Sequence, residues 1–431
     1  MSSLEAAPAP VAWQPAEGGL RTGLGAAQEN ARRQFAAWTD REVAPFAGEW
    51  DRAGATPRSV IERMAAEGFL GAVVPAELGG TGWDAVTFGL LNEELGRGCS
   101  SIRSLVTVHS MACHAIARWG SRAQKEAWLP AMARGERIGA FGLSEPEVGS
   151  DAGAIGTTAE LDGDAYVLRG TKKWTTYGQI ADVLLCFAKA DGKPLAMLVD
   201  LHAPGVTVEP LTVHGTRASM VAQITFDGVR VPKSDRLAGP GFGLGVALSV
   251  LELGRYSVAC GCVGILRACL DASASYAATR VQGGSVIGLH QLVQAMLADM
   301  ATDWRAARLL CLHAGWLRDQ NDPDAAREVF HAKYFASTAA TRAALSAVQI
   351  HGANGLTDDY PVERLLRDSR VMEIIEGSTQ IQQVTLGRWE VERGASDGVK
   401  TAQAQAGGAV GHATSRQVGA GASTQAPGLS G

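Results

Sequence analysis

The stretch Thr157–Arg169, TTAELDGDAYVLR, decides the fold, because two short runs of strand-forming residues flank the dipeptide Asp162-Gly163. Asp-Gly is a preferred pair for a two-residue turn between antiparallel strands. Further runs of the same kind lie at residues 183–189, 195–199, 206–211 and 223–231. Segments of helix length are missing between these runs. We therefore expect an antiparallel sheet, closed or sandwiched, rather than a doubly wound nucleotide fold.

Apolar residues at helical spacing surround this strand region on both sides. Before it, Thr56-Pro57 predicts a capping residue followed by proline at the first helical position, and Ser121 with Gln124 predicts a capping box. After it, the last of three long helices is expected to start with Asp322 as its cap and Pro323 behind it. These helical patterns cover residues 244–278, 289–319 and 323–349. Such lengths are typical of a helical bundle.

The expected fold class is therefore α+β, in three consecutive domains. We predict an N-terminal α-helical domain over 26–138, a middle antiparallel β domain over 139–245 and a C-terminal domain like a four-helix bundle over 246–393. Residues 1–25 are rich in Ala, Pro and Gly and lack the features of a secretory signal, so we expect a flexible N-terminus. Residues 394–431 are predicted to be a disordered low-complexity tail.

Composition excludes several classes of function. The 431 residues are 46% hydrophobic with a net charge of −5, and no apolar run is long enough to span a bilayer, so neither nucleic acid nor membrane is an expected partner. The seven cysteines and nine histidines show no metal-ligand spacing, so no metal site is expected. Cysteines in apolar helical surroundings favour a reducing cytoplasm.

One candidate catalytic residue stands near the end of the last helical pattern, in Met372–Gln382, MEIIEGSTQIQ. Glu376 follows Ile374 and Ile375 and precedes a glycine that permits an abrupt turn. Burial beside the isoleucines would raise the carboxylate pKa toward neutrality, where it could act as a general base. The alternative from this stretch alone is a solvated helix end, with Ser378 or Thr379 as the cap of the next helix.

Two loops of the strand region carry residues suited to a flat ligand. The first, residues 141–151, alternates hydroxyls and glycines, which suits a polar-edged ring or a pyrophosphate. The second, residues 172–178, offers an aromatic plane and hydroxyls at the end of a strand. Taken singly, the first could be an ordinary turn and the second a strand with a core tryptophan.

Taken together, these motifs resemble those of the flavin-dependent acyl-CoA dehydrogenase family. The resemblance covers roughly residues 26–393 and rests on three separated motifs. They are Gly142-Leu143-Ser144-Glu145 with Gly149-Ser150-Asp151, then Gln349–Leu356 with Asp359, Arg364 and Asp368, and last Ile375-Glu376-Gly377-Ser378-Thr379-Gln380. The resemblance implies the acyl-CoA dehydrogenase fold, the cofactor FAD and an oligomer, dimer or tetramer.

The resemblance also assigns cofactor contacts. Residues lining or covering the flavin ring would be Phe141, Leu143, Ser144, Ser150, Trp174 and Thr176. Contacts in the same subunit would come from Thr379 and Gln380, and contacts to the FAD of a neighbouring subunit from Arg280, Gln291, Gln349 and Gly352. Arg280 and Gln291 could instead mark solvated helix ends. Departures from the family pattern are Val148, Ala353 and Gly283, and the aromatic missing at Gly283 puts the intersubunit contact there in question.

By the same resemblance, Glu376 would remove the α-proton of an acyl thioester while hydride leaves the β-carbon for flavin N5. Some family members place the base immediately before the arginine that matches Arg255. Here that position is Gly254, which cannot serve, and Glu252 is out of register. Ser150, Arg255 and Gly377 would contact the substrate; Arg255, expected at the start of a long helix, meets either the pantetheine arm or a helix-terminal carboxylate.

A narrower resemblance is to the acyl-carrier-protein dehydrogenases that make hydroxymalonyl or methoxymalonyl extender units for polyketide antibiotics. Its residues are Cys99–Ser104, Gly254-Arg255, Ser257–Ala259, Gly261–Ala268 and Met372–Ser378. It implies oxidation at C3 of a short acyl group held by an acyl carrier protein, the proton then coming from oxygen. The alternatives are α,β-dehydrogenation of a short or branched acyl-CoA, a non-catalytic flavin-binding member of the fold, and a flavin monooxygenase. An electron-transfer flavoprotein is the expected type of electron acceptor.

Overall fold

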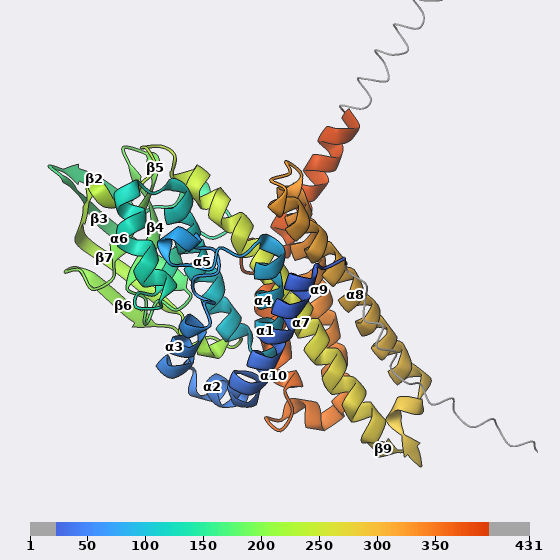
Figure 1. Cartoon of the computed structure of the whole chain (residues 1–431). Coiled ribbons are helices and arrows are strands. Elements are labelled where there is room, and N and C mark those ends of the chain that lie inside the picture. The colour runs from blue at the N-terminus through green and yellow to red at the C-terminus, as the bar shows by residue number, and fades with distance from the viewer. Residues whose placement is uncertain (1–22, 396–431) are drawn as a thin grey trace, which may run out of the picture. The chain divides into compact units, whose positions relative to one another are not determined.

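The computed structural model describes residues 23–395, and the expected flexible N-terminus and most of the expected tail lie outside them. Contacts divide the chain after Thr379, and residues 380–395 of the second unit are helical. In the first unit, helices, strands and again helices follow one another along the chain (Figure 1). The predicted α+β fold class is confirmed.

The N-terminal helices are α1 Ala26–Glu42, α2 Ala47–Ala53, α3 Arg58–Ala66, α4 Ala85–Gly98, α5 Ser100–Trp119 and α6 Arg122–Ala133. Short 3-10 helices lie at Ala44–Phe46 and Ala76–Leu78 in this region. The capping box predicted for α6 is present: the Ser121 hydroxyl accepts from Gln124 N and the Gln124 side chain accepts from Ser121 N. The cap predicted at Thr56 is wrong. Pro57 is the N-cap of α3, and the Thr56 hydroxyl instead donates to the carbonyl of Ala218, 162 residues away, at 2.8 Å.

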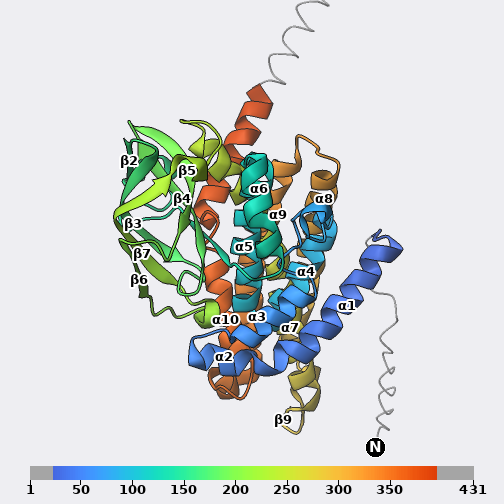
Figure 2. The same cartoon turned by 60° about the vertical axis from the view of Figure 1, so that its left-hand side comes forward.

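The strands are β1 Gly139–Gly142, β2 Thr158–Asp162, β3 Ala165–Thr175, β4 Val183–Ala190, β5 Lys193–Asp200, β6 Val206–Pro210, β7 Ala222–Pro232 and β8 Arg236–Leu237. They form one sheet in the order β6-β7-β3-β2-β4-β5-β8, with β1 also on β4 (Figure 2). The β2–β3 and β4–β5 hairpins have the predicted antiparallel pairing. The sheet is not purely antiparallel, however, because β1 pairs with β4 in parallel and Thr158 of β2 pairs in parallel with Lys189.

Strand β4 explains why the sheet packs on the helices. Its apolar run is buried on both faces, which is typical of a strand covered on two sides. Val183, Leu185 and Phe187 belong to a core shared with Met111 of α5 and Val250 of α7. The alternate side chains Leu184, Cys186 and Ala188 belong to a core within the sheet region. One face of β4 therefore fixes the sheet against the two helices that flank the site.

The C-terminal helices are α7 Gly243–Thr279, α8 Gln291–Asp319, α9 Ala325–His351 and α10 Val362–Met372, with a hairpin of β9 Val281–Gln282 and β10 Ser285–Val286 after α7. Helices α7, α8 and α9 pack side by side with α4 and α10 against them (Figure 1). The predicted start of α9 is wrong: Asp324 is its N-cap. Asp322 accepts from Asp324 N at 2.8 Å, so it closes the turn before the helix.

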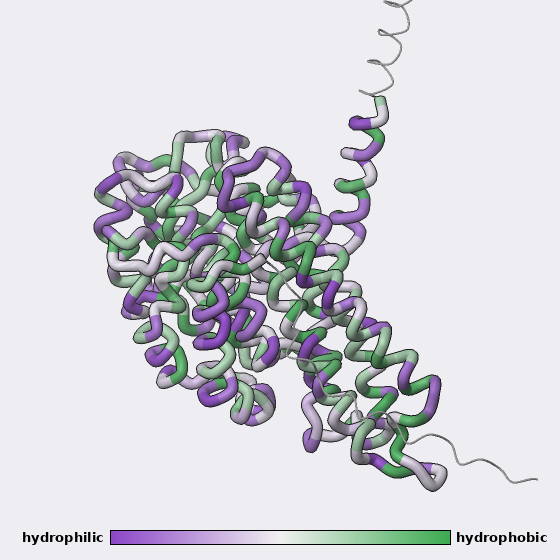
Figure 3. The backbone as a smooth tube through the Cα atoms, turned by 45° about the vertical axis from the view of Figure 1, so that its right-hand side comes forward, coloured by the Kyte–Doolittle hydropathy of each residue, from purple (hydrophilic) through white to green (hydrophobic). Residues whose placement is uncertain are grey.

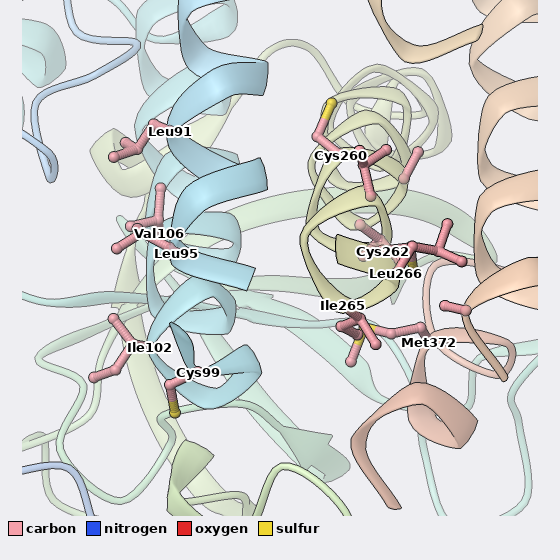
Figure 4. Close-up of a cluster of buried hydrophobic side chains, with 14 of the residues drawn as sticks. Leu91, Leu95, Cys99, Ile102, Val106, Cys260, Cys262, Ile265, Leu266 and Met372 are labelled. Atoms are coloured by element: carbon pink, nitrogen blue, oxygen red, sulfur yellow. The ribbon is translucent and has the colours of Figure 1, made fainter. Parts of the chain in front are cut away.

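The central core of the first unit forms where α4, α5 and α7 meet. Figure 4 shows Leu91 and Leu95 of α4, Ile102 and Val106 of α5, and Ile265 and Leu266 of α7 in this cluster. Met372, the last residue of α10, lies in the same cluster and is fully buried. The end of α10 is thereby fixed against α7, and the turn that carries Glu376 begins directly after it.

Helix α7 alone, among the described residues, is long and apolar enough by composition to cross a membrane. Of its most apolar window, 78% is buried within the protein, which is the pattern of a core helix. Along the chain, hydrophobic and hydrophilic residues alternate within the helices (Figure 3).

Candidate active site

Glu376 lies in a turn between two helices. Helix α10 ends at Met372, and both Glu376 and Gly377 have left-handed backbones, with φ of +56° and +91°. A non-glycine residue in this region is strained, and such residues cluster at active sites. The Oε2 atom of Glu376 is inaccessible to solvent. A Cβ built on Gly254 of α7 would lie 2.7 Å from Glu376 Cδ and 2.9 Å from Met111 Sδ. The glycine therefore leaves room for the carboxylate between α5 and α7.

Burial raises the pKa of Glu376 to about 7, while Arg255, Lys333 and Arg103 act in the opposite direction. The carboxylate therefore titrates near neutrality, as a general base requires. The cause differs from the one expected from the sequence. Ile374 is 57% exposed and does not bury the carboxylate. The carboxylate is buried by α7, which carries Gly254, and by α5, which carries Met111.

Two buried cations hold this turn by its backbone. Arg255 Nε donates to the main-chain carbonyl of Glu376 at 2.9 Å, and its guanidinium lies 4.4 Å from the ring centre of Phe330. Lys333 of α9, fully buried, donates to the carbonyl of Gly377 at 2.8 Å. The expected place of Arg255 at the start of a helix is wrong, because α7 begins at Gly243. Arg255 positions the backbone of the base, and its predicted contact with the pantetheine arm stays a prediction.

The flavin loops predicted from the sequence meet at one place. The loop after β1 and the end of β3 are joined by a hydrogen bond from Lys173 N to the carbonyl of Ser144, at 2.9 Å. Trp174 follows with φ of +65° and 56% of its surface exposed, although Lys172 and Thr175 on either side are buried. Leu143 is nearly buried, and Ser150 is exposed.

These features fit a flat aromatic cofactor. Lys173 Nζ lies 4.9 Å from the centre of the exposed indole ring, and a stacked ring system would cover what remains of this plane on its strained backbone. Phe141 and Thr176, at the same two loops, are each half-buried, and Phe141 packs on Phe187 with ring centres 5.5 Å apart. The hydrogen bond from Lys173 to Ser144 thus brings the two predicted loops together, and the contacts of their residues with the flavin stay a prediction.

A buried ion pair fixes the first flavin loop, and sequence reasoning missed it. Lys172 is fully buried and donates to Glu145 at 2.7 Å and to the carbonyl of Leu143 at 3.2 Å. Glu145 also accepts from Gly156 N, Thr157 N and the Thr157 hydroxyl. Burial alone would raise the pKa of Glu145, but the hydrogen bonds from Lys172 and Thr157 lower it to about 2. The sequence signal for this ion pair was Glu145, three residues after Gly142 of the loop, together with Lys172 in the facing strand.

Replacing Lys172 with methionine is expected to destabilise the protein by about 3–5 kcal/mol, because it leaves a buried carboxylate without its cation. Thermal unfolding and the retained FAD absorbance would measure this. Lys233→Met, at an exposed lysine, is the matched control and should leave both unchanged. Because the native pKa of Glu145 is lowered, its stabilising contribution is complete above about pH 4.5 and is lost as the pH falls toward 2. An unchanged melting temperature in Lys172→Met would contradict the assignment.

A pocket of about 220 Å³ lies at the far end of α7. Its lining is Tyr276, Arg280, Gln282, Ile287, Ile350, His351, Gly352, Ala353 and Asn354. It therefore includes Arg280 and Gly352 of the predicted intersubunit FAD contacts, whereas Gln291 and Gln349 are exposed and do not line it. Gly283 and Gly284 form the turn of the β9–β10 hairpin, with φ of +62° and +82°. Gly283, where the family pattern has an aromatic residue, therefore occupies a position that favours glycine.

The remaining predicted residues lie near the turn of Glu376 or beyond it. Thr379 is nearly buried, and its N–H donates to the carbonyl of Glu373 at 2.9 Å, which closes the turn. Gly377 gives its carbonyl to Lys333. Gln380 is the first residue of the second unit. Among the described residues, no group of His, Cys, Asp and Glu could hold a metal ion.

Three family models match the chain. They are the N-terminal domain of acyl-CoA dehydrogenase over residues 25–136, the middle domain over residues 140–229 and the C-terminal domain over residues 241–390. Probable acyl-CoA dehydrogenase YngJ of Bacillus subtilis is 39% identical over 369 residues, which cover 84% of this chain and 97% of that protein. The human mitochondrial short-chain specific acyl-CoA dehydrogenase is 38% identical over 361 residues, covering 82% and 87%.

Solved structures show the same fold. A glutaryl-CoA dehydrogenase of Mycobacterium smegmatis in complex with FADH2 is 29% identical, with a TM-score of 0.81 over 85% of this chain and 94% of that one. FkbI, for biosynthesis of the methoxymalonyl extender unit of the polyketide Fk520, is 36% identical, with a TM-score of 0.77 over 84% and 99%. The prolyl acyl carrier protein oxidase AnaB is 27% identical, with a TM-score of 0.81 over 85% and 99%.

Proposed function

The chain belongs to the acyl-CoA dehydrogenase family and is an FAD-dependent oxidoreductase of acyl thioesters, and from this premise we propose that its substrate is a short acyl group on a carrier protein, oxidised at C3. The loss of two hydrogens from the C3 alcohol gives an aldehyde, which would be a precursor of a hydroxymalonyl- or methoxymalonyl-type extender unit of a polyketide. The likeness to FkbI and AnaB supports a carrier-protein substrate. The observation that carries the proposal is a row of buried polar side chains on the face of α7 that carries Gly254, the residue against which Glu376 lies.

This row of side chains lies where α5 and α7 face each other. Gly254, Ser257 and Gly261 follow one another at about one-turn intervals on α7. The hydroxyls of Thr107 and Ser257 lie 2.5 Å apart, and Ser257 also donates to Asn92 at 2.7 Å. A short alkyl chain would gain nothing from these groups, because burying polar groups against an apolar chain costs free energy.

Arg103 stands at the inner end of the same row. It is 1% exposed and lies against Gly261, where a Cβ would be 2.8 Å from its Cδ. Its guanidinium donates to Thr107 Oγ1 at 2.8 Å and to Ser104 Oγ at 3.1 Å. In the described chain no carboxylate lies within 4.0 Å of it, and its Nε has no hydrogen-bond partner. The carboxylates of Glu376 and Asp368 act on its charge only from beyond this distance. A buried cation without a close carboxylate is costly, so an acyl group with oxygen at C3 complements this site better than a hydrocarbon.

In this mechanism the chain's own residues bind the acyl group and move a proton. Arg103, whose Nε has no hydrogen-bond partner within the described residues, would donate to a polar acyl group, and Thr107, which accepts from the same guanidinium, would hold it in place. Glu376, with a pKa near 7, accepts the proton from the C3 hydroxyl, and Arg255 and Lys333 hold its backbone during the transfer. Bound FAD, held by Phe141, Leu143, Ser144, Trp174 and Thr176, supplies the acceptor for the hydride that leaves C3.

Incubation of the purified FAD-loaded protein with glyceryl, seryl and butyryl thioesters, each on acyl carrier protein and on CoA, tests the proposal. We expect anaerobic bleaching of the flavin with a hydroxylated acyl group on the carrier protein, and mass analysis of the arm should show the loss of two hydrogens. Bleaching by butyryl-CoA alone, with an enoyl product, would contradict the proposal in favour of α,β-dehydrogenation.

Replacing Arg103 with leucine should lower kcat/KM for the hydroxylated substrate by about 10- to 100-fold, the usual effect of losing a hydrogen bond to a charged group. The rate with butyryl-CoA, if any, should stay the same or rise. Arg103→Lys keeps the charge and should retain part of the activity. FAD content and melting temperature must be measured for both variants, since equal losses on all substrates would show a structural role instead.

The second candidate, desaturation of a short acyl-CoA, is favoured by the 38% identity to a short-chain specific enzyme. Glu376 would then take the α-proton of the thioester. The two functions differ in which proton the same carboxylate receives.

The remaining partners follow from the same proposal. The pocket with Arg280 and Gly352 at the end of α7, and the exposed Leu289 and Leu292 nearby in sequence, 63% and 81% exposed, support a dimer or tetramer. An electron-transfer flavoprotein is the proposed electron acceptor. All seven cysteines are free and buried, which supports a reducing cytoplasm.

A further inference from the structure

The first turns of α7 expose large hydrophobic side chains. Phe242, directly before the helix, is 49% exposed, and Leu244 and Leu248 are 40% and 54% exposed. Figure 1 shows the chain entering α7 beside the sheet at β5, and a Cβ on Gly243 would lie within 2.7 Å of the backbone of Pro194 and Leu195. The three side chains therefore stand where α7 meets the β4–β5 hairpin.

These side chains begin a stripe that leads to the catalytic turn. Leu244, Leu248, Leu251 and Arg255 are spaced by four, three and four residues, so they share one face of α7. Leu251 is half-buried and Arg255 is only 8% exposed, so the stripe passes from the surface into the site. With a rise of about 1.5 Å per residue, it covers about 16 Å from Leu244 to the residue that holds the backbone of Glu376.

Basic side chains flank the outer end of the stripe. Arg118 stacks on Trp119 at 5.4 Å, and the Trp119 ring lies 5.1 Å from that of Phe242. On the other side, Lys189 pairs in register with Pro194, and Lys193 precedes that proline.

In the described chain none of these three cations lies within 4.0 Å of a carboxylate, whereas Arg318 of α8 is paired with Glu252, further along α7. Asp191, at the tip of the same hairpin, is the acidic residue next to Lys193 in sequence.

We propose that Arg118, Lys189, Lys193, Phe242, Leu244 and Leu248, the α7 entry surface, dock an acidic carrier protein whose thioester arm then lies along the stripe. The inference rests on the proposed function and deepens it. The phosphate that joins such an arm to its protein is an anion at the surface, and the apolar side chains accept the stem of the arm behind it. Unpaired cations around an exposed apolar patch attract an acidic partner and speed its association.

The test compares one acyl group on three carriers. The hydroxylated acyl group is offered on acyl carrier protein, on CoA and as the small N-acetylcysteamine thioester, which has no phosphate and no protein. The variants are the double charge reversal Arg118→Glu/Lys193→Glu and the apolar change Leu248→Ser. Arg33→Glu, an exposed arginine of α1, is the matched control. FAD content and melting temperature are measured for each.

Both variants should lower kcat/KM for the carrier-protein substrate by about tenfold or more through KM, as expected when rim charges steer association. The small thioester should react at the wild-type rate. The loss in the charge-reversal variant should shrink at high salt, because exposed charges are screened. Arg33→Glu should match the wild type on every substrate.

Two results would overturn the inference. An equal loss on CoA and carrier protein would show that the cations bind the phosphate alone, and an altered oligomeric state in the variants would show that a second copy of the chain covers the surface. If the wild-type protein does not accept the carrier-protein substrate at all, the proposed function fails. The comparison of the three carriers with the wild-type protein shows this before any variant is made.

Discussion

Replacing Glu376 with glutamine should lower the rate of flavin reduction by the substrate by about 10²- to 10⁴-fold, the usual range for loss of a positioned general base. The amide has nearly the same shape and can fill the space left by Gly254, so FAD binding should survive. Anaerobic stopped-flow absorbance of the flavin measures the rate directly. Glu67→Gln, at an exposed glutamate directly after α3, is the control and should leave the rate unchanged.

The pH dependence sharpens this prediction. Because burial raises the pKa of Glu376 to about 7, the reduction rate in the wild type should rise with pH through about 7 and then level off. A pH-independent rate would contradict a role for this carboxylate as the base.

The ionised form of Glu376 should lower the free energy of unfolding of the protein. An acid whose native pKa is raised binds more protons in the folded state, so its contribution to stability is complete below about pH 4.5 and is lost as the pH rises through about 7. Glu376→Gln should therefore have a higher melting temperature than the wild type at pH 8. A variant that lost activity through misfolding would instead melt earlier.

Replacing Gly254 with alanine should lower the same rate by about 10²-fold, because a misplacement of the base by about 1 Å is worth that much. The new methyl group would lie 2.7 Å from Glu376 Cδ and 2.9 Å from Met111 Sδ, so the carboxylate must move. Neither neighbour is free to yield, since Met111 is fully buried and two cations hold the turn.

Gly48→Ala is the matched control for this change. Gly48 is also within a helix, α2, and a Cβ there meets nothing closer than 3.6 Å, at a flexible arginine. It should leave the rate unchanged and stabilise the fold slightly, as alanine does in helices. If Gly254→Ala lowered FAD content as much as the rate, the methyl group would be acting on the fold and not on Glu376.

Local sequence signals predicted the elements well wherever both partners of an interaction are close in the chain. The β2–β3 hairpin could be recognised, although its turn is Gly163-Asp164, one residue later than the predicted Asp162-Gly163. The Ser121–Gln124 capping box lies within one helical turn and could be recognised as well. Thr56 shows where this fails. Its hydroxyl could accept from an N–H of the first helical turn, but it instead donates to the carbonyl of Ala218 and lies 2.8 Å from the Tyr177 hydroxyl, and no local pattern contains that information.

The sequence predicted the residues of the candidate site but not the buried basic residues that hold them in place. Glu376 and Trp174 belong to motifs that could be recognised, whereas Lys333 gave no signal, and Lys172 and Arg103 stood in recognised stretches without a sign that they are buried. Each of these is a basic residue in an otherwise ordinary strand or helix, and lysine and arginine are normally exposed. Only the packing of distant segments shows that all three are buried.

Tyr177 ties the sheet region to the helices before it. Its phenol is fully buried, donates to the carbonyl of Ser101 on α5 at 3.0 Å and lies 2.8 Å from the hydroxyl of Thr56. Burial raises its pKa, so the phenol stays protonated and the link persists at any physiological pH. A fragment cut at the borders of the middle strands would expose both this phenol and the apolar face of β4 to solvent. The three sections of the chain should therefore unfold as one cooperative body in dissection experiments, and not as separable modules.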